Sequence, residues 1–313
     1  MAMILLLGAH GYVGRNFAAH LQAKGLEVHA PSRAAHDYTD AAVLRKLLRE
    51  LRPDFVINAA GFAGKPTVDA CETARADTLE GNTVFPLRVA EACAEAGVRW
   101  GHVSSGCVYQ GDKGADASGK AIGFSEEDAP NFSFHAGECS FYSGTKALAE
   151  EFLVKGGYDV HIWRLRVPFD QHDNARNCLS KLMRYKRLLD VRNSLSHLGD
   201  FVASAWATME RGLPRGIYNL TNPGSVTAKE VVELIRAEGE RRRAAGDAFS
   251  AEHMLKSYAW FESEDEFMKT TAVARRSSCV LDTTKAEKLG LPLRPVREAL
   301  ADSLRNWTWE TPA

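Results

Sequence analysis

The sequence has no long hydrophobic run. Its opening, MAMILLLGAHG, carries no charged segment before the apolar residues, and a glycine interrupts these at about strand length. The opening therefore predicts a first buried strand and not a signal peptide. No segment approaches the roughly 20 apolar residues that a membrane-spanning helix needs, so we expect no membrane partner.

An excess of charge of one sign is also missing. The 313 residues include 39 Lys and Arg against 40 Asp and Glu, which gives a net charge of -1 and a pI near 6.8. Such a chain has no field that would attract nucleic acid, so any anionic ligand needs a local site. The six cysteines show no CxxC pair, which predicts no metal site, reduced thiols and, by default, a cytoplasmic location.

What the chain does have is an alternation of short strand-like runs, such as MILLLGA, LEVHAPS, DFVINAAG and RWGHVSSG, with longer helical patterns. This alternation predicts an α/β fold with a Rossmann-type doubly wound parallel sheet over residues 1–167. The regular alternation of strands and helices changes after residue 167. We therefore expect residues 168–313 to form a smaller, partly discontinuous substrate-binding lobe with some segments returning to the sheet. Within this lobe NCLSKLMRYKRLL is predicted to be helical, and residues 111–139 form a long loop able to close over a site.

The motif GAHGYVG follows the first strand and opens a helix. Its glycines, Gly8, Gly11 and Gly14, let the backbone approach a pyrophosphate, whose charge then lies at the helix N-terminus. Tyr12 and Val13 lie inside this turn and are predicted to contact the cofactor as well. Because a strand precedes the motif and a helix follows it, a dinucleotide site is favoured over a plain tight turn.

The GxxGxxG spacing resembles the extended short-chain dehydrogenase/reductase superfamily. After the second strand the chain offers Ser32 and Arg33 where an NAD enzyme would place a carboxylate, so NADPH is the favoured cofactor, with NADH left open. Arg33 as a plain surface charge remains the alternative. The resemblance implies that Asp37 and Tyr38 flank the adenine. It also implies that the stretch NAAG passes under the cofactor's ribose and phosphates; its residues are Asn58, Ala59, Ala60 and Gly61.

Catalytic chemistry is predicted in FYSGTKALAE, where Tyr142 and Lys146 are four apart on a helix and therefore lie on one face. A neighbouring ammonium and the nicotinamide charge lower the pKa of a phenol toward a useful range for proton transfer. Together with Ser105 they complete the Ser, Tyr and Lys set of the superfamily. The two hydroxyls would bind a substrate carbonyl, and Tyr142 would donate a proton as hydride arrives.

Cys107 lies in the stretch HVSSGCVYQG, two residues after Ser105. In a strand these two side chains point to the same side, so the sulfur is expected near the same carbonyl. A thiolate there can remove a proton from the carbon beside the carbonyl, while Tyr142 stabilises the enolate. Inversion needs a second acid. An inert buried cysteine is the alternative.

A set of motifs spread over most of the chain favours a catalytic role for Cys107 over an inert one. SSGCVY, IGFSEEDAPNF, FYSGTKALAEE, LRVP, ARNCLSKLMRYKR and YNLTNPGSVTAKEVVEL together resemble the bifunctional 3,5-epimerase/4-reductases of plant nucleotide-rhamnose synthesis. The resemblance implies that Cys107 is the epimerisation cysteine and Lys181 its partner acid. It also implies that Asn177 and Arg276 contact the substrate. Without it, Lys181 is interpreted as part of a solvated basic helix.

The function implied by this resemblance is epimerisation of a nucleotide 4-keto-6-deoxyhexose at C3 and C5, followed by NADPH-dependent reduction at C4. UDP-4-keto-6-deoxyglucose is the favoured substrate. Gly106 and Cys107 replace the Asp-Glu pair of a dehydratase, so a separate 4,6-dehydratase must supply it. A single-function 4-ketoreductase and a non-catalytic NADP-binding regulator remain the alternatives. The superfamily often dimerises through a helix pair, which leaves a homodimer open here.

Overall fold

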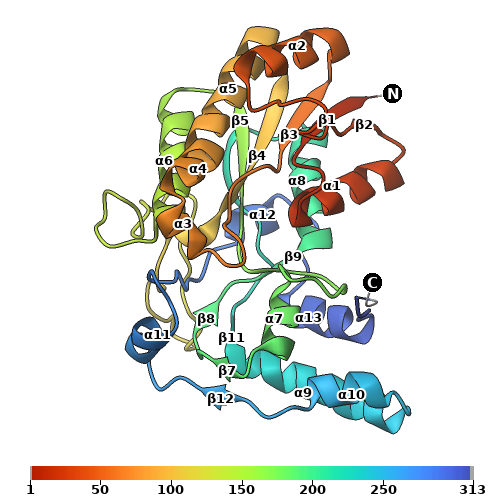
Figure 1. Cartoon of the computed structure of the whole chain (residues 1–313), viewed down its shortest axis with the longest axis vertical. Coiled ribbons are helices and arrows are strands. Elements are labelled where there is room, and N and C mark those ends of the chain that lie inside the picture. The colour runs from red at the N-terminus through yellow and green to blue at the C-terminus, as the bar shows by residue number, and fades with distance from the viewer. Residues whose placement is uncertain (1, 311–313) are drawn as a thin grey trace.

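A computed structural model describes residues 2–310 and contains a central sheet of six parallel strands (Figure 1). In space the strands follow the order β10-β5-β4-β3-β1-β2. Their bounds are β1 Met3–Leu7, β2 Glu27–His29, β3 Phe55–Asn58, β4 Arg99–Ser105, β5 Val160–Leu165 and β10 Gly216–Asn219. Strands β3 and β5 are buried along their whole length, as expected when helices cover both faces of a parallel sheet. The predicted doubly wound sheet is confirmed.

Two helical layers enclose this sheet. On one face lie α1 (Tyr12–Ala23), α8 (Leu198–Glu210) and α12 (Thr284–Lys288). On the other lie α2 (Ala41–Leu51), α5 (Phe85–Ala96) and α6 (Phe141–Lys155). Alternate residues of β1 serve the two layers: Ile4 and Leu6 join the first core, and Leu5 and Leu7 the second.

A third core forms the smaller lobe, in the lower part of Figure 1. Its helices are α7 Cys178–Arg184, α9 Ala228–Ala244, α10 Ala248–Met254, α11 Glu264–Thr270 and α13 Val296–Arg305. Its strands pair as β6 Pro168–Phe169 with β9 Ser196–His197, β7 Arg187–Leu188 with β12 Ala259–Trp260, and β8 Arg192–Asn193 with β11 Val226–Thr227. Strand β10 and helix α8 come from the same half of the chain but belong to the sheet layers. The division at residue 167 stays a prediction.

One local prediction was wrong. The helix expected through NCLSKLMRYKRLL ends at Arg184, and the chain then enters β7. Residues 111–139 form a long loop as predicted, anchored at Gly111 and Phe124 to residues 278–282, and its closure over a site stays a prediction. Gly111 donates to the Ser278 carbonyl at 2.6 Å, and Phe124 donates to the Val280 carbonyl at 2.9 Å. No helix within residues 2–310 has the length and apolar character required to cross a membrane.

Shorter helical turns connect these elements near the sheet's carboxyl edge. After β3 the chain forms α3 (Ala70–Thr73) and α4 (Arg75–Leu79). A π-helical turn, η1 (Glu80–Val84), then continues directly into α5. After β4 it forms a 3₁₀ turn, η2 (Gly106–Val108). Turns of this kind change the direction of side chains at functional sites, and both lie beside the predicted catalytic residues.

Candidate active site

The glycine turn lies between the carboxyl ends of β1 and β3, where the strand order of the sheet reverses. Gly8 has a φ of 82°, and a Cβ there would lie 2.5 Å from the Ala60 nitrogen. A Cβ on Gly14 would lie 2.0 Å from the Gly8 carbonyl oxygen. Gly11 caps α1 without a side chain, and the first turn of the helix carries no acidic residue. The turn therefore fits the pyrophosphate of a dinucleotide.

The residues around this turn have different roles. Ser32, Arg33 and Asp37 follow β2, and Arg33 and Asp37 are exposed, so contacts with a cofactor stay a prediction for them. Tyr38 is 4% exposed, and its hydroxyl accepts a hydrogen bond from the Gly8 nitrogen at 3.2 Å. Its ring packs on Phe85 in the core. Tyr38 therefore supports the glycine turn, and its contact with the adenine stays a prediction.

The predicted stretch Asn58–Gly61 also lies under the turn. Asn58 is fully buried, and its side-chain oxygen accepts a hydrogen bond from the Ala60 nitrogen at 3.0 Å. This contact shapes the bend that brings Ala59, Ala60 and Gly61 beside Gly8. Sequence reasoning missed Asn82 in the π turn. Its side chain accepts from the Phe62 nitrogen and donates to the Phe62 carbonyl, each at 2.8 Å, and so holds the next residue.

Ser105, Tyr142 and Lys146 are brought together at the end of β4 and the start of α6. The Ser140 side chain caps α6 by accepting from the Ser143 nitrogen at 3.1 Å. The Ser105 hydroxyl lies near the Tyr142 phenol and acts to lower its pKa. The Lys146 Nζ donates to the Val103 carbonyl at 3.2 Å. The three side chains therefore form one cluster beneath the cofactor turn.

Burial controls the protonation of this cluster. It raises the pKa of Tyr142, against the opposing effects of the Ser105 hydroxyl and the Arg166 guanidinium. We expected Lys146 to lower the pKa of Tyr142, but Lys146 is not among the groups that act on this pKa. The phenol consequently stays protonated, which is the form that can donate a proton. Burial also lowers the pKa of Lys146 to about 8.

Cys107 lies in the same cluster, but the alternation of side chains along a strand does not explain its position. Strand β4 ends at Ser105, and Cys107 lies in the 3₁₀ turn, so the two-residue period of a strand does not apply to it. The Ser105 side chain instead caps the turn by accepting from the Cys107 nitrogen at 3.2 Å. Burial raises the pKa of the thiol, and the Ser105 and Ser143 hydroxyls oppose this rise.

Lys181 belongs to a second cluster on α7. It is partly buried, whereas Arg184, Lys186 and Arg187 of the same basic stretch are exposed. Burial lowers the pKa of Lys181; Cys178 opposes this shift, and Arg176 and Arg276 add to it. The solvated-helix interpretation therefore does not describe its environment. Cys107 is not among the groups that act on it.

The two residues predicted to contact substrate differ sharply. Arg276 forms an ion pair with Asp69, which follows β3, and its Nη1 is buried without a hydrogen-bond partner within residues 2–310. The neighbouring Arg275 is exposed. Asn177 is fully buried as the cap of α7, and its side chain accepts from the Leu179 nitrogen and donates to Asp170. Asn177 therefore positions α7, and its substrate contact stays a prediction.

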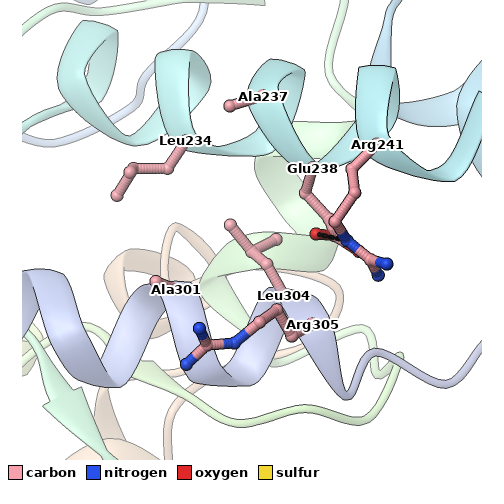
Figure 2. Close-up of a pocket in the computed structure, with 7 residues that line it drawn as sticks. All are labelled: Leu234, Ala237, Glu238, Arg241, Ala301, Leu304 and Arg305. Carbon is pink, nitrogen blue, oxygen red and sulfur yellow. Dashed lines mark hydrogen bonds and ion pairs between the residues drawn. The ribbon is translucent and has the colours of Figure 1, made fainter. Parts of the chain in front are cut away.

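A separate groove lies between α9 and α13 (Figure 2). Its lining is Leu234, Ala237, Glu238, Arg241, Ala301, Leu304 and Arg305. Glu238 is ion-paired with Arg241, so its charge is already compensated. None of the residues that the sequence predicts for catalysis or binding lines this groove. Within residues 2–310, no group of three His, Cys, Asp or Glu side chains could hold a metal ion.

Fold and site together define a reductase of the nucleotide-cofactor class. The sequence matches the family described as RmlD substrate binding domain over residues 1–308, and the chain belongs to that family. It is 32% identical over 95% of its length to a bifunctional dTDP-4-dehydrorhamnose 3,5-epimerase/dTDP-4-dehydrorhamnose reductase of Arabidopsis thaliana, of which it covers 90%. It is 30% identical over 95% of its length to a trifunctional UDP-glucose 4,6-dehydratase/UDP-4-keto-6-deoxy-D-glucose 3,5-epimerase/UDP-4-keto-L-rhamnose-reductase from the same plant, of which it spans only 40%.

Solved structures show the same fold. The L780 UDP-rhamnose synthase of Acanthamoeba polyphaga mimivirus matches with a TM-score of 0.82 at 24% identity, over 97% of this chain and 99% of that one. A dTDP-4-dehydrorhamnose reductase from Bacillus anthracis, solved in complex with NADP, matches with a TM-score of 0.76 at 18% identity, over 98% of each chain. The relatives thus include both bifunctional epimerase/reductases and reductases.

Proposed function

We propose that this protein epimerises a nucleotide 4-keto-6-deoxyhexose at C3 and C5 and then reduces C4 with NADPH, giving a nucleotide-L-rhamnose. The observation that carries the proposal is the position of Cys107 in a turn capped by Ser105, in the same cluster as Tyr142. A reductase alone has no need of a thiol beside the carbonyl-binding hydroxyls. The relatives named as bifunctional enzymes support the same activity.

NADPH would be held by the glycine turn at the start of α1, with the adenosine end near Ser32 and Arg33. When bound, it supplies the hydride for C4. Arg33 is exposed beyond β2 and free to meet a 2′-phosphate. The NADP named for the Bacillus anthracis neighbour agrees with this choice of cofactor.

Each epimerisation step removes one proton from a ring carbon and adds one proton to the same carbon. The Cys107 thiolate removes the proton from C3 or C5, which gives a thiol and an enolate whose oxygen is held by the Ser105 and Tyr142 hydroxyls. The Lys181 ammonium then delivers a proton to the opposite face of the same carbon. An acid and a base on different elements, η2 and α7, are compatible with inversion, which needs them on opposite faces of the carbon. Exchange with water restores the thiolate and the ammonium.

Reduction uses the same carbonyl. Tyr142 donates its phenolic proton to the C4 oxygen as hydride reaches C4, and the phenolate is protonated again from solvent. Lys146, at hydrogen-bonding distance from the Val103 carbonyl, keeps a positive charge under the site. The buried, unpartnered Nη1 of Arg276 is suited to the substrate's diphosphate.

UDP-4-keto-6-deoxyglucose is the proposed substrate, supplied by a separate 4,6-dehydratase. The dehydratase named within the trifunctional relative supports this order of reactions. We place the reaction in the cytoplasm, where the thiol stays reduced. The runner-up is a plain 4-ketoreductase, and the specific observation in its favour is that burial raises the pKa of Cys107.

The test is product analysis with UDP-4-keto-6-deoxyglucose and NADPH, followed by NMR of the product. UDP-L-rhamnose is expected, and Tyr142→Phe should lower the turnover number by about 10²–10⁴-fold with NADPH still bound. Turnover only with the already epimerised keto sugar would favour the plain ketoreductase. Binding of NADPH without any turnover would favour a regulator.

A further inference from the structure

Arg166 directly follows strand β5 and contacts the segment that packs on the Cys107 turn. Its Nη2 donates to the Ser277 carbonyl, the Ser277 hydroxyl donates to the Tyr109 carbonyl at 2.6 Å, and the Cys279 thiol donates to the Gly106 carbonyl at 3.1 Å. The backbone of Arg166 is held on both sides by Ser196. Its nitrogen donates to the Ser196 hydroxyl at 3.0 Å, and its carbonyl accepts from the Ser196 nitrogen at 2.7 Å.

Among the described residues, 2–310, no carboxylate forms an ion pair with Arg166, whose side chain is 8% exposed. Nη2 donates to the Asn193 side-chain oxygen at 2.7 Å and to the Ser277 carbonyl, both neutral groups. In the same part of the chain, Nε is buried and has no hydrogen-bond partner. A buried cation without a carboxylate is costly, and such a group persists where its charge has a use.

Arg164, two residues earlier and within β5, shows the usual solution. It is also buried, but Glu150 neutralises it with contacts of 2.6–3.1 Å. Val167, directly after Arg166, has a φ of 39°, an unfavourable conformation for a β-branched residue. Backbone strain of this kind is concentrated at functional sites. The chain thus adopts a strained bend where it places an uncompensated guanidinium beside Cys107.

We infer that Arg166 is the positioning residue whose charge stabilises the thiolate of Cys107, so that the thiol can act as the epimerisation base. This inference rests on the proposed function and adds a residue to it. It agrees with the direction of the pKa shifts, because Arg166 opposes the rise that burial imposes on Cys107. Other groups around the thiol also act on it or are affected by it: Lys146 and Tyr142 on α6, and Cys139 just before α6.

The sharpest test uses Asn193, which contacts the guanidinium directly. Asn193→Asp has the same shape but places a carboxylate 2.7 Å from Nη2, which neutralises the cation without removing it. Arg166→Met removes the charge, and Arg166→Lys restores one. Arg192→Gln, next to Asn193 but exposed, is the matched control. The readout is the pH dependence of Cys107 alkylation by iodoacetamide, followed by peptide mass spectrometry.

We expect Asn193→Asp and Arg166→Met to move the midpoint of Cys107 alkylation upward by about one pH unit, so that the rate at pH 7.5 falls about tenfold. Arg166→Lys should keep the midpoint and the rate of Cys107 alkylation close to those of the wild type. Arg192→Gln should leave both unchanged. A purely structural arginine would be stabilised by the new carboxylate and would leave the midpoint unchanged. Because Asn193→Asp keeps Arg166 in place, this variant answers the question even if Arg166→Met does not fold.

Exchange of solvent deuterium into the keto sugar separates this inference from the proposed function. The same variants should slow exchange at C3 and C5 about tenfold and leave reduction of the pre-epimerised sugar within a few-fold of wild type. An unchanged alkylation midpoint together with weaker binding of the nucleotide sugar would overturn the inference and make Arg166 a substrate-binding group. Shifted midpoints in a protein that catalyses no exchange would refute the proposed function but leave the effect of Arg166 on Cys107 established.

Discussion

Replacing Glu150 by Gln should destabilise the layer that carries the catalytic helix. Glu150 is 3% exposed and lies one helical turn after Lys146 on α6. Its carboxylate accepts from the Nε and Nη2 atoms of Arg164 on β5, at 2.6–3.1 Å, and from the Ser104 hydroxyl on β4. The carboxylate therefore ties α6 to two strands of the sheet.

The magnitude follows from the burial of the partner. Glutamine keeps the shape but removes the charge and turns one acceptor into a donor that faces N–H groups. The guanidinium of Arg164, 1% exposed, is then left without compensation. Breaking a buried ion pair in this way costs about 3–5 kcal/mol. The Tyr109 hydroxyl, which accepts from Nη1 at 3.0 Å, compensates for only part of this loss because it carries no charge.

The assay is urea unfolding followed by circular dichroism, with Glu151→Gln as the matched control. Glu151 is the next residue on the helix and pairs with Lys155 and His135 near the surface, so its loss should leave the unfolding midpoint unchanged. A Glu150→Gln midpoint indistinguishable from that of Glu151→Gln would refute the reasoning. It would mean that the buried pair contributes nothing beyond its shape.

Three further predictions concern the cofactor and the pH profile. The ammonium of Lys146 is present below its pKa of about 8 and lost above it, so the reductase rate should fall as the pH rises through 8, and Lys146→Arg should move this limb higher. Gly8→Ala places a Cβ 2.5 Å from the Ala60 nitrogen and should weaken NADPH binding, measured by calorimetry, more than tenfold. Gly25→Ala is the control: its Cβ meets nothing within 4 Å, so this variant should bind NADPH normally despite about 1 kcal/mol of backbone strain. Arg33→Ala should raise the KM for NADPH roughly tenfold to hundredfold and leave that for NADH unchanged.

The parts of the fold that local pattern controls could be predicted from the sequence. Strand runs such as MILLLGA are apolar because both faces of a parallel sheet are covered. The glycines of GAHGYVG have local backbone and steric reasons to be glycine, which are visible in the spacing. The pairing of Tyr142 with Lys146 depends only on the period of one helix. These features therefore need no knowledge of distant contacts.

The end of β4 could not be predicted in the same way. Treating residues 105–107 as strand placed Cys107 beside Ser105 by alternation, but the strand stops at Ser105 and a capped 3₁₀ turn produces the contact. The sequence pattern also does not show that the Tyr38 hydroxyl binds the Gly8 nitrogen. Nor does it show that Asn177 caps α7.

The importance of Arg166 is a tertiary property. In the sequence, WRLRVP contains two arginines that no local rule distinguishes. Only the register of β4 with β5 and the position of Glu150 show that Arg164 is neutralised and Arg166 is not. Arg276 and Arg275 are likewise not distinguished by the sequence. Asp69, more than 200 residues earlier, pairs with Arg276.

The most direct test of the account is incubation with UDP-4-keto-6-deoxyglucose in heavy water without NADPH, with deuterium at C3 and C5 followed by NMR and mass spectrometry. The account predicts incorporation at both carbons by the wild type and none by Cys107→Ala, which should still reduce the pre-epimerised sugar when NADPH is added. Equal incorporation by both proteins would contradict the role of the thiol. No incorporation by either, with NADPH still consumed on pre-epimerised sugar, would show that the enzyme is a reductase only.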